Sequence, residues 1–148
     1  MKKALFLLLL CCSILLGCTA CGNAAKDANA PAASEAEAIS MSVDTRTLTP
    51  QGASFTLRNN TGTPYIYGAE YRIEKQENNT WRAVETDGEM MFTAIGYLLN
   101  AHGTATVDVN WEFGYGTLEA GSYRLVKTFR NDSAREETHE VAAVFEIR

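Results

Sequence analysis

The strongest constraint on the fold is an alternation of apolar and polar residues that runs through most of the chain after residue 38. In GTATVDVNW, one face holds Ala105, Val107, Val109 and Trp111, and the other face holds threonine, aspartate and asparagine. The same period of two appears in HEVAAVFEIR, GAEYRIEK and ASFTLRN. Such alternation is typical of β-strands with one buried face and one solvated face.

Three further segments, ISMSVDT, TWRAVE and SYRLVKTF, complete a set of about seven expected strands. Turn signals such as NNTG, ENNT, TDGE and NAHG separate them. Short strands with a turn about every ten residues predict an all-β fold, an antiparallel β-sandwich over residues 39–148. This length suffices for one core without disulfides. We expect the apolar run from Met90 to Leu99 to cross between the sheets and to be buried.

The first 17 residues have the pattern of a secretory signal peptide. Two lysines precede an apolar run, Ala4 to Leu16, which is shorter than the about 20 residues of a membrane-spanning helix. The run ends in LLGC, which resembles the lipobox of bacterial lipoproteins. The resemblance implies that Cys18 becomes the first mature residue and carries diacylglycerol on its sulfur. The protein would then be anchored to the cell membrane by lipid, on its extracytoplasmic side.

The other cysteines leave alternatives open. All four cysteines lie at Cys11, Cys12, Cys18 and Cys21, and Cys21 could be the lipidated residue instead. The Cys18-x-x-Cys21 spacing could also be half a zinc site or a redox pair, but no second pair and no nearby histidine accompany it. Residues 18–38 are rich in alanine and lack large apolar side chains, so we expect a lipid-anchored, disordered tether.

One local motif sharpens the fold prediction. The segment LEAGSYRL places Leu118, Gly121 and Tyr123 at the entry to the sixth expected strand. This motif resembles the tyrosine corner of immunoglobulin-like sandwiches, in which the tyrosine hydroxyl bonds to nearby backbone. Leu125 stands where antibody domains carry their second core cysteine, and we expect Leu57 or Phe55 to be its partner.

The domain as a whole resembles the bacterial immunoglobulin-like (Big-type) domains of lipoproteins, found chiefly in Firmicutes. The matching stretches are FTLRNNTGTPYIYGAEYRIEK, Trp81, FTAIGYLL, VNWEFGYGTLEAGSYRLVKTF and FEIR. The resemblance implies an immunoglobulin-like sandwich at the cell surface, and it assigns no activity to particular residues. A looser resemblance links the chain to the small Ig-like proteinase inhibitors of bacilli, through the second strand, the tryptophan after a hairpin and the Gly-x-Tyr motif.

Charge and residue content argue against several classes of function. The chain has 13 Lys and Arg against 18 Asp and Glu. Loss of Lys2 and Lys3 with the signal leaves 11 against 18, a net charge of −7, which disfavours nucleic acid. Asp132, Ser133 and His139 share one expected hairpin, but a polar hairpin supplies such groups by default. We therefore expect no catalytic residue, no metal and no cofactor.

Three aromatic residues near expected loops are candidate ligand contacts: Tyr65, Phe113 and Tyr115. They could stack on a sugar or anchor a protein, or they could fill the open ends of the sandwich. The sequence thus predicts a non-catalytic interaction or structural domain, with an envelope protein or a neutral glycan as partner. A surface proteinase inhibitor is the alternative, and an enzyme is a further one.

Overall fold

The computed structural model describes residues 37–134 and 136–148, which form nine β-strands and one short helix. The predicted signal peptide, Cys18 and most of the predicted tether lie outside the described residues. Within the described part of the chain, no helix is long and apolar enough to span a membrane. The elements are β1 (Ile39–Val43), β2 (Gly52–Asn59), β3 (Tyr65–Tyr67), β4 (Arg72–Glu77), β5 (Thr80–Ala83), β6 (Tyr97–Leu99), β7 (Thr104–Asn110), α1 (Glu112–Tyr115), β8 (Gly121–Asn131) and β9 (Thr138–Ile147).

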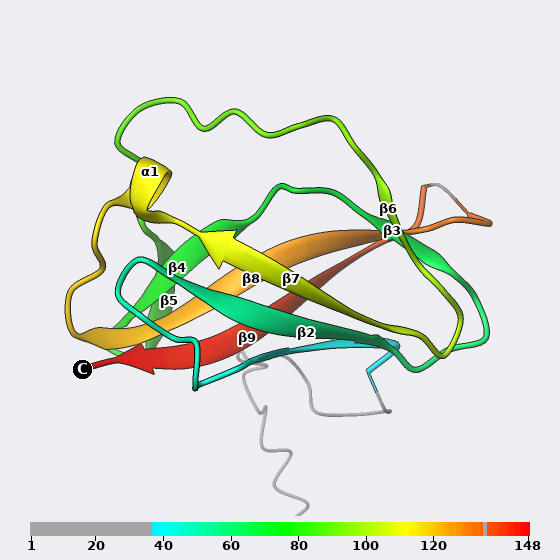
Figure 1. The fold of residues 1–148 in the computed structure, drawn as a ribbon, viewed down its shortest axis with the longest axis horizontal. Coiled ribbons are helices and arrows are strands. Elements are labelled where there is room, and N and C mark those ends of the chain that lie inside the picture. Colours follow the sequence, from blue (N-terminus) through cyan, green and yellow to red (C-terminus); the bar gives the residue numbers. More distant parts are fainter. Residues whose placement is uncertain (1–36, 135) are drawn as a thin grey trace, which may run out of the picture. The chain divides into compact units, whose positions relative to one another are not determined.

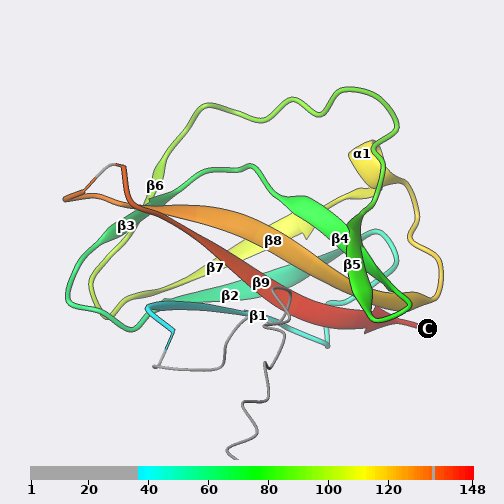
Figure 2. The ribbon, with the colours of Figure 1, turned by 180° about the vertical axis from the view of Figure 1, so that it is seen from behind.

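The strands form two antiparallel sheets, as the sequence predicts (Figure 1). One sheet has the order β1-β2-β7, and the other has the order β5-β4-β8-β3-β6. The long strand β8 organises the second sheet, because β9 pairs along one of its edges while β4 and β3 pair with the two ends of its other edge. Figure 2 shows β9, β8 and β4 from behind. The seven predicted strands correspond to β1, β2, β4, β5, β7, β8 and β9.

The core lies between the sheets and follows the predicted alternation. Phe55 and Leu57 of β2 are fully buried, and every second residue of β9 from Val141 to Ile147 faces the core. Trp111 is also fully buried; its ring stacks on Phe145 with centroids 5.3 Å apart, and its Nε1 donates a hydrogen bond to the Pro50 carbonyl. The period-two pattern therefore identified the buried face correctly.

The segment Met90–Leu99 differs from the prediction, because most of it is exposed. Met91 is 90% exposed and Leu98 is 54% exposed, whereas Leu99 is buried. The reason is topological: β5 and β6, which this segment joins, belong to the same sheet, so the chain need not pass between the sheets. Figures 1 and 2 show it arching away from the strands.

The sequence also missed an interruption between β3 and β4. Tyr67 pairs with Phe129 of β8, and Arg72 pairs with Val126. Four residues, 68–71, therefore lie opposite only two residues of β8, 127 and 128. The chain between β3 and β4 thus has two more residues than its partner strand, as in a large β-bulge. The predicted strand GAEYRIEK begins inside this interruption, and only its second half is β4.

Candidate functional site

A cleft of about 500 Å³ opens at the side of the sandwich, a volume within the rough range of 300–1,000 Å³ typical of ligand sites. Its walls come from the β3–β4 interruption, the segment before β6, the strand β7, the helix α1 and one residue of β8. The lining residues are Tyr67, Gly68, Ala69, Tyr71, Met90, Met91, Phe92, Tyr97, Thr106, Val107, Asp108, Val109, Asn110, Phe113, Gly114 and Lys127.

Two contacts hold the exposed segment 84–96 against α1. The backbone N–H of Asp87 donates a 2.8 Å hydrogen bond to the Gly114 carbonyl. The side chain of Met90 packs on Gly114 so closely that a Cβ at that position would collide with the Met90 sulfur. A residue larger than glycine would therefore displace Met90 and widen the cleft.

Tyr71 lines the cleft and contacts both β7 and the segment 84–96. Its hydroxyl donates a 3.2 Å hydrogen bond to the Asn110 carbonyl at the end of β7, and its ring meets the edge of Phe92 at a centroid distance of 5.3 Å. Burial, with the neighbouring Tyr115, raises the pKa of Tyr71 to about 12. The hydroxyl thus stays protonated at neutral pH and keeps donating this bond, which ties the β3–β4 interruption to β7 of the other sheet.

The three predicted ligand-contact aromatics have different environments. Phe113 lines the cleft and is 91% exposed. Tyr65 is the first residue of β3; its side chain faces the core, packs edge-on against His139 and is only 4% exposed. The ligand-contact role expected for Tyr65 is therefore corrected to a packing role. Tyr115 is half-buried: its hydroxyl accepts a hydrogen bond from the Ile73 N–H, and its ring lies beside Tyr71, so it too serves packing.

The residues of the predicted tyrosine corner lie at the start of β8. Leu118 and Tyr123 are buried, and Gly121 is the first residue of the strand. The Tyr123 hydroxyl donates a 2.9 Å hydrogen bond to the carbonyl of Glu119, four residues earlier. This is the kind of hydrogen bond that a tyrosine corner makes. Leu125 is fully buried in the same core cluster as Phe55 and Leu57.

Sequence reasoning overlooked Lys127, which lines the cleft from β8 and is only 3% exposed. Its Nζ donates hydrogen bonds to the carbonyls of Gly68 (2.9 Å) and Glu70 (2.8 Å) and lies 5.8 Å from the ring centroid of Tyr67. Burial lowers the pKa of Lys127, an effect that the charge of Glu70 opposes. The alternation in β8 could have predicted the burial of Lys127. Tyr123, Leu125 and Phe129 face the core, and Lys127 occupies the same face at the position between Leu125 and Phe129.

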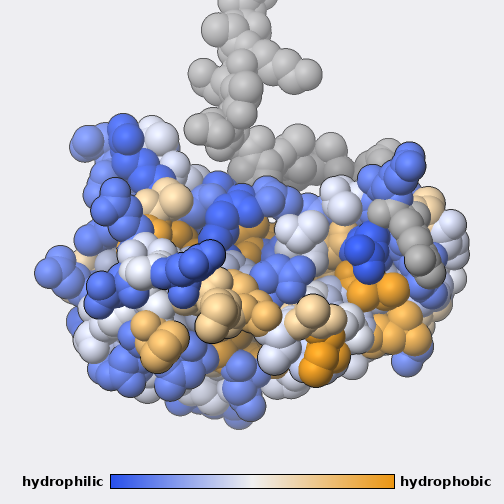
Figure 3. Space-filling model, turned by 90° about the horizontal axis from the view of Figure 1, so that it is seen from above, coloured by the Kyte–Doolittle hydropathy of each residue, from blue (hydrophilic) through white to orange (hydrophobic). Residues whose placement is uncertain are grey.

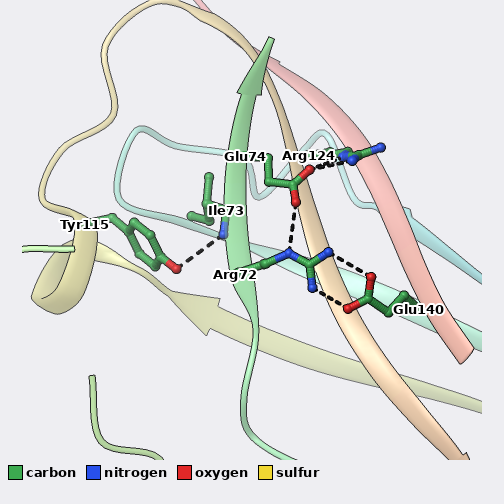
Figure 4. A network of polar contacts seen from close by, with 6 residues as sticks. All are labelled: Arg72, Ile73, Glu74, Tyr115, Arg124 and Glu140. Carbon is green, nitrogen blue, oxygen red and sulfur yellow. Dashed lines mark hydrogen bonds and ion pairs between the residues drawn. The ribbon is translucent and has the colours of Figure 1, made fainter. Parts of the chain in front are cut away.

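A second polar cluster joins β4, β8 and β9 (Figure 4). Arg72 forms two hydrogen bonds with the Glu140 carboxylate, of 2.5 and 2.8 Å, and a third with Glu74. Arg124 binds the other oxygen of Glu74 at 2.5 Å. Burial pushes the pKa of Glu74 upward, but the hydrogen bonds from both arginines outweigh it and hold that pKa below its ordinary value. Glu74 therefore stays ionised and links the strands, which does not suit proton transfer at neutral pH.

In the described part of the hairpin between the last two strands, no hydrogen bond joins the side chains of Asp132, Ser133 and His139. Asn131 Oδ1 accepts hydrogen bonds from the backbone N–H groups of Ser133 and Ala134, a turn role, and both Asp132 and Ser133 are exposed. Over residues 37–134 and 136–148, no group of three His, Cys, Asp or Glu side chains is placed to hold a metal ion.

Comparison with known proteins identifies the family. No curated protein matches the chain. The family described as "Bacterial Ig-like domain" matches residues 35–146, which is more than half of the chain. The matched range covers nearly all of both sheets, the hydrogen bond from Tyr123 to Glu119 and all residues of the cleft. The chain therefore belongs to the bacterial Ig-like domain family.

Proposed function

We propose that this protein is a lipid-anchored envelope lipoprotein whose Ig-like domain binds a partner through the cleft beside β7. Membership of the family indicates a non-catalytic structural or interaction module. The lipobox-like LLGC ending at Cys18 supports the anchor. One acyl chain holds a protein only marginally, whereas two or three make release from the membrane slow. Such an anchor would keep the domain next to other envelope components.

The observation that carries the binding role is the gathering of exposed apolar side chains around one cleft. Phe113 and Met91 are 91% and 90% exposed, and Phe92 and Tyr97 are 37% and 44% exposed. All four line the cleft. Single exposed apolar residues are ordinary, but a cluster around a concavity is typical of an interaction site. Figure 3 shows orange patches on the face from which segment 84–96 and α1 project.

The walls of the cleft favour binding with little rearrangement. The Tyr71–Asn110 hydrogen bond and the packing of Met90 on Gly114 fix two of its sides. Binding to a site that is already formed avoids part of the entropy cost of ordering loops. Aromatic rings can contact either apolar side chains or the faces of sugar rings. These features support an envelope protein or a neutral glycan as partner, and the net charge of −7 after loss of Lys2 and Lys3 disfavours anionic polymers.

Site-specific photocrosslinking in the bacterium that makes the protein tests this proposal. A benzophenone amino acid at position 113, inside the cleft, should give a discrete adduct. The same amino acid at position 144 is the matched control, because Val144 of β9 is also exposed (59%) but does not line the cleft. Mass spectrometry of the digested adduct would identify a protein through peptides of a second chain, and a fall in the mass of the adduct on glycosidase treatment would identify a glycan. Equal adducts from both positions, or none from position 113, would show that the cleft does not bind the partner.

A further inference from the structure

The cleft contains a buried positive charge that its own hydrogen bonds do not neutralise. Lys127 donates to two backbone carbonyls, which uses two of the three N–H groups of its ammonium. The Glu70 carboxylate acts on this charge from a longer distance, but no carboxylate within residues 37–134 and 136–148 forms an ion pair with it. Buried charges in proteins are normally paired, because an isolated charge is poorly solvated away from water. An anionic group entering the cleft would supply the direct ion pair that Glu70 does not form.

The strand that borders the cleft has an unpaired edge. β7 is the last strand of its sheet and pairs only with β2 in the described part of the chain. Residues 106–110 of β7 line the cleft. An exposed edge presents backbone N–H and C=O groups that can bind an extended peptide as an added strand. The cleft thus offers backbone hydrogen bonds along one wall and apolar contacts from Met91 and Phe113 on another.

We propose that the cleft receives the extended C-terminal segment of a partner protein, which lies along β7 and places its terminal carboxylate at Lys127. This inference rests on the proposed binding function and adds the chemistry of the ligand. The C-terminus of a protein has a feature that matches each part of the cleft. Its carboxylate can pair with Lys127, its backbone can pair with the edge of β7, and its side chains can fill the apolar space.

The other residues of the cleft favour a peptide terminus over an acidic sugar or polymer. Phe92, Phe113 and Met91 supply apolar contacts that peptide side chains can fill, and the polar residues Thr106 and Asn110 lie on β7, where a peptide backbone would pair. Asp108 of β7 is exposed and also lines the cleft, where it accepts a hydrogen bond from the Ser54 hydroxyl. Its negative charge would repel a polymer with many charges more than a segment with a single one.

Titration of the purified protein with short probes, followed by amide NMR shifts, tests the proposal. The first probe is acetyl-Thr-Val-Thr-Phe with a free carboxylate, and the second is the same peptide with a C-terminal amide. We expect the acid to bind at least about tenfold more tightly than the amide, because the amide carbonyl can still accept a hydrogen bond but lacks the negative charge that pairs with the ammonium of Lys127. The shifts should concentrate at Val107, Val109 and Phe113.

Variants and a third probe separate the outcomes. Asp108→Asn should tighten binding of the acid a few-fold by removing a repulsive charge, and Val144→Ala, outside the cleft, should not change it. N-acetylmuramic acid carries a carboxylate on a sugar; tighter binding of this probe than of the peptide acid would overturn the peptide assignment. Equal binding of acid and amide at the cleft would overturn the carboxylate inference while leaving the cleft as a binding site. If no probe shifts the cleft residues and crosslinking from position 113 also fails, the proposed function fails with it.

Discussion

The ammonium of Lys127 lies 2.9 Å from the carbonyl oxygen of Gly68, a residue 59 positions earlier in the chain. This bond, with its companion to the Glu70 carbonyl, satisfies backbone groups where two extra residues interrupt the pairing of β3 and β4 with β8. One lysine thus stabilises the interruption and also places a buried charge in the cleft. The fold at this position and the proposed binding of a carboxylate therefore both depend on Lys127.

Replacing Lys127 should lower the stability of the fold. Lys127→Met keeps most of the aliphatic length but leaves two carbonyls without their donor, so we expect the free energy of unfolding to fall by roughly 2 kcal/mol. Urea titration measures this. Arg130→Met removes the same charge from an exposed position of the same strand and should have little effect. Equal losses in the two variants would show that net charge, rather than the hydrogen bonds of Lys127, explains the change.

Removing the Tyr123 hydroxyl should destabilise the domain while leaving its ring in the core. Tyr123→Phe eliminates the hydrogen bond to the Glu119 carbonyl and should cost about 1–2 kcal/mol. Chemical denaturation compares it with Tyr97→Phe, a control whose hydroxyl makes no hydrogen bond to the described residues and whose ring is partly exposed. A neutral Tyr123→Phe variant would mean that the tyrosine corner does not contribute to stability.

The stability contributed by Glu74 should depend on pH. Because its pKa in the folded protein is lowered, its contribution is present above the ordinary value of 4.5 and is lost as the pH falls through the folded pKa. Glu74→Gln should therefore be clearly less stable than the unmodified protein at pH 7, and this difference should shrink by pH 3. Denaturation at both pH values measures it. The exposed Glu85→Gln serves as control and should show no difference at either pH.

Lipidation should depend on Cys18. Cys18→Ala should abolish incorporation of a fatty-acid probe and leave uncleaved precursor, since its sulfur is the expected acceptor. Metabolic labelling followed by electrophoresis detects both effects, and Cys21→Ala should label normally. Undiminished label in Cys18→Ala, with loss in Cys21→Ala, would move the anchor to Cys21.

The exposed segment 84–96 should be a substrate for proteases and not an inhibitor of them. Met91 is 90% exposed and the segment has no regular secondary structure, features typical of sites of limited proteolysis. Brief digestion should cut here first, and mass spectrometry locates the cut. Stoichiometric inhibition of any protease in a panel of serine proteases would favour the inhibitor alternative and contradict this prediction.

The sequence alone determined the fold class and most of the core. Alternation placed Phe55, Leu57 and Trp111 on buried faces, because a strand at the surface of a core must turn every second side chain inward. The hydrogen bond from Tyr123 near the start of β8 to Glu119 also lies within one local stretch, since the two residues are only four positions apart. These features depend on neighbours in the chain and are therefore visible in a local pattern.

Only the tertiary structure decided which residues form the cleft. Hydropathy could not show that the apolar segment around Met91 is exposed, because exposure depends on where β5 and β6 lie in one sheet. Nor could it show that Tyr65 is buried while Phe113 is free, since both lie near loops. The bond from Lys127 to Gly68 joins residues that are distant in sequence. The register of β8 against β3 and β4 brings them together, and that register is set by packing across the whole sandwich.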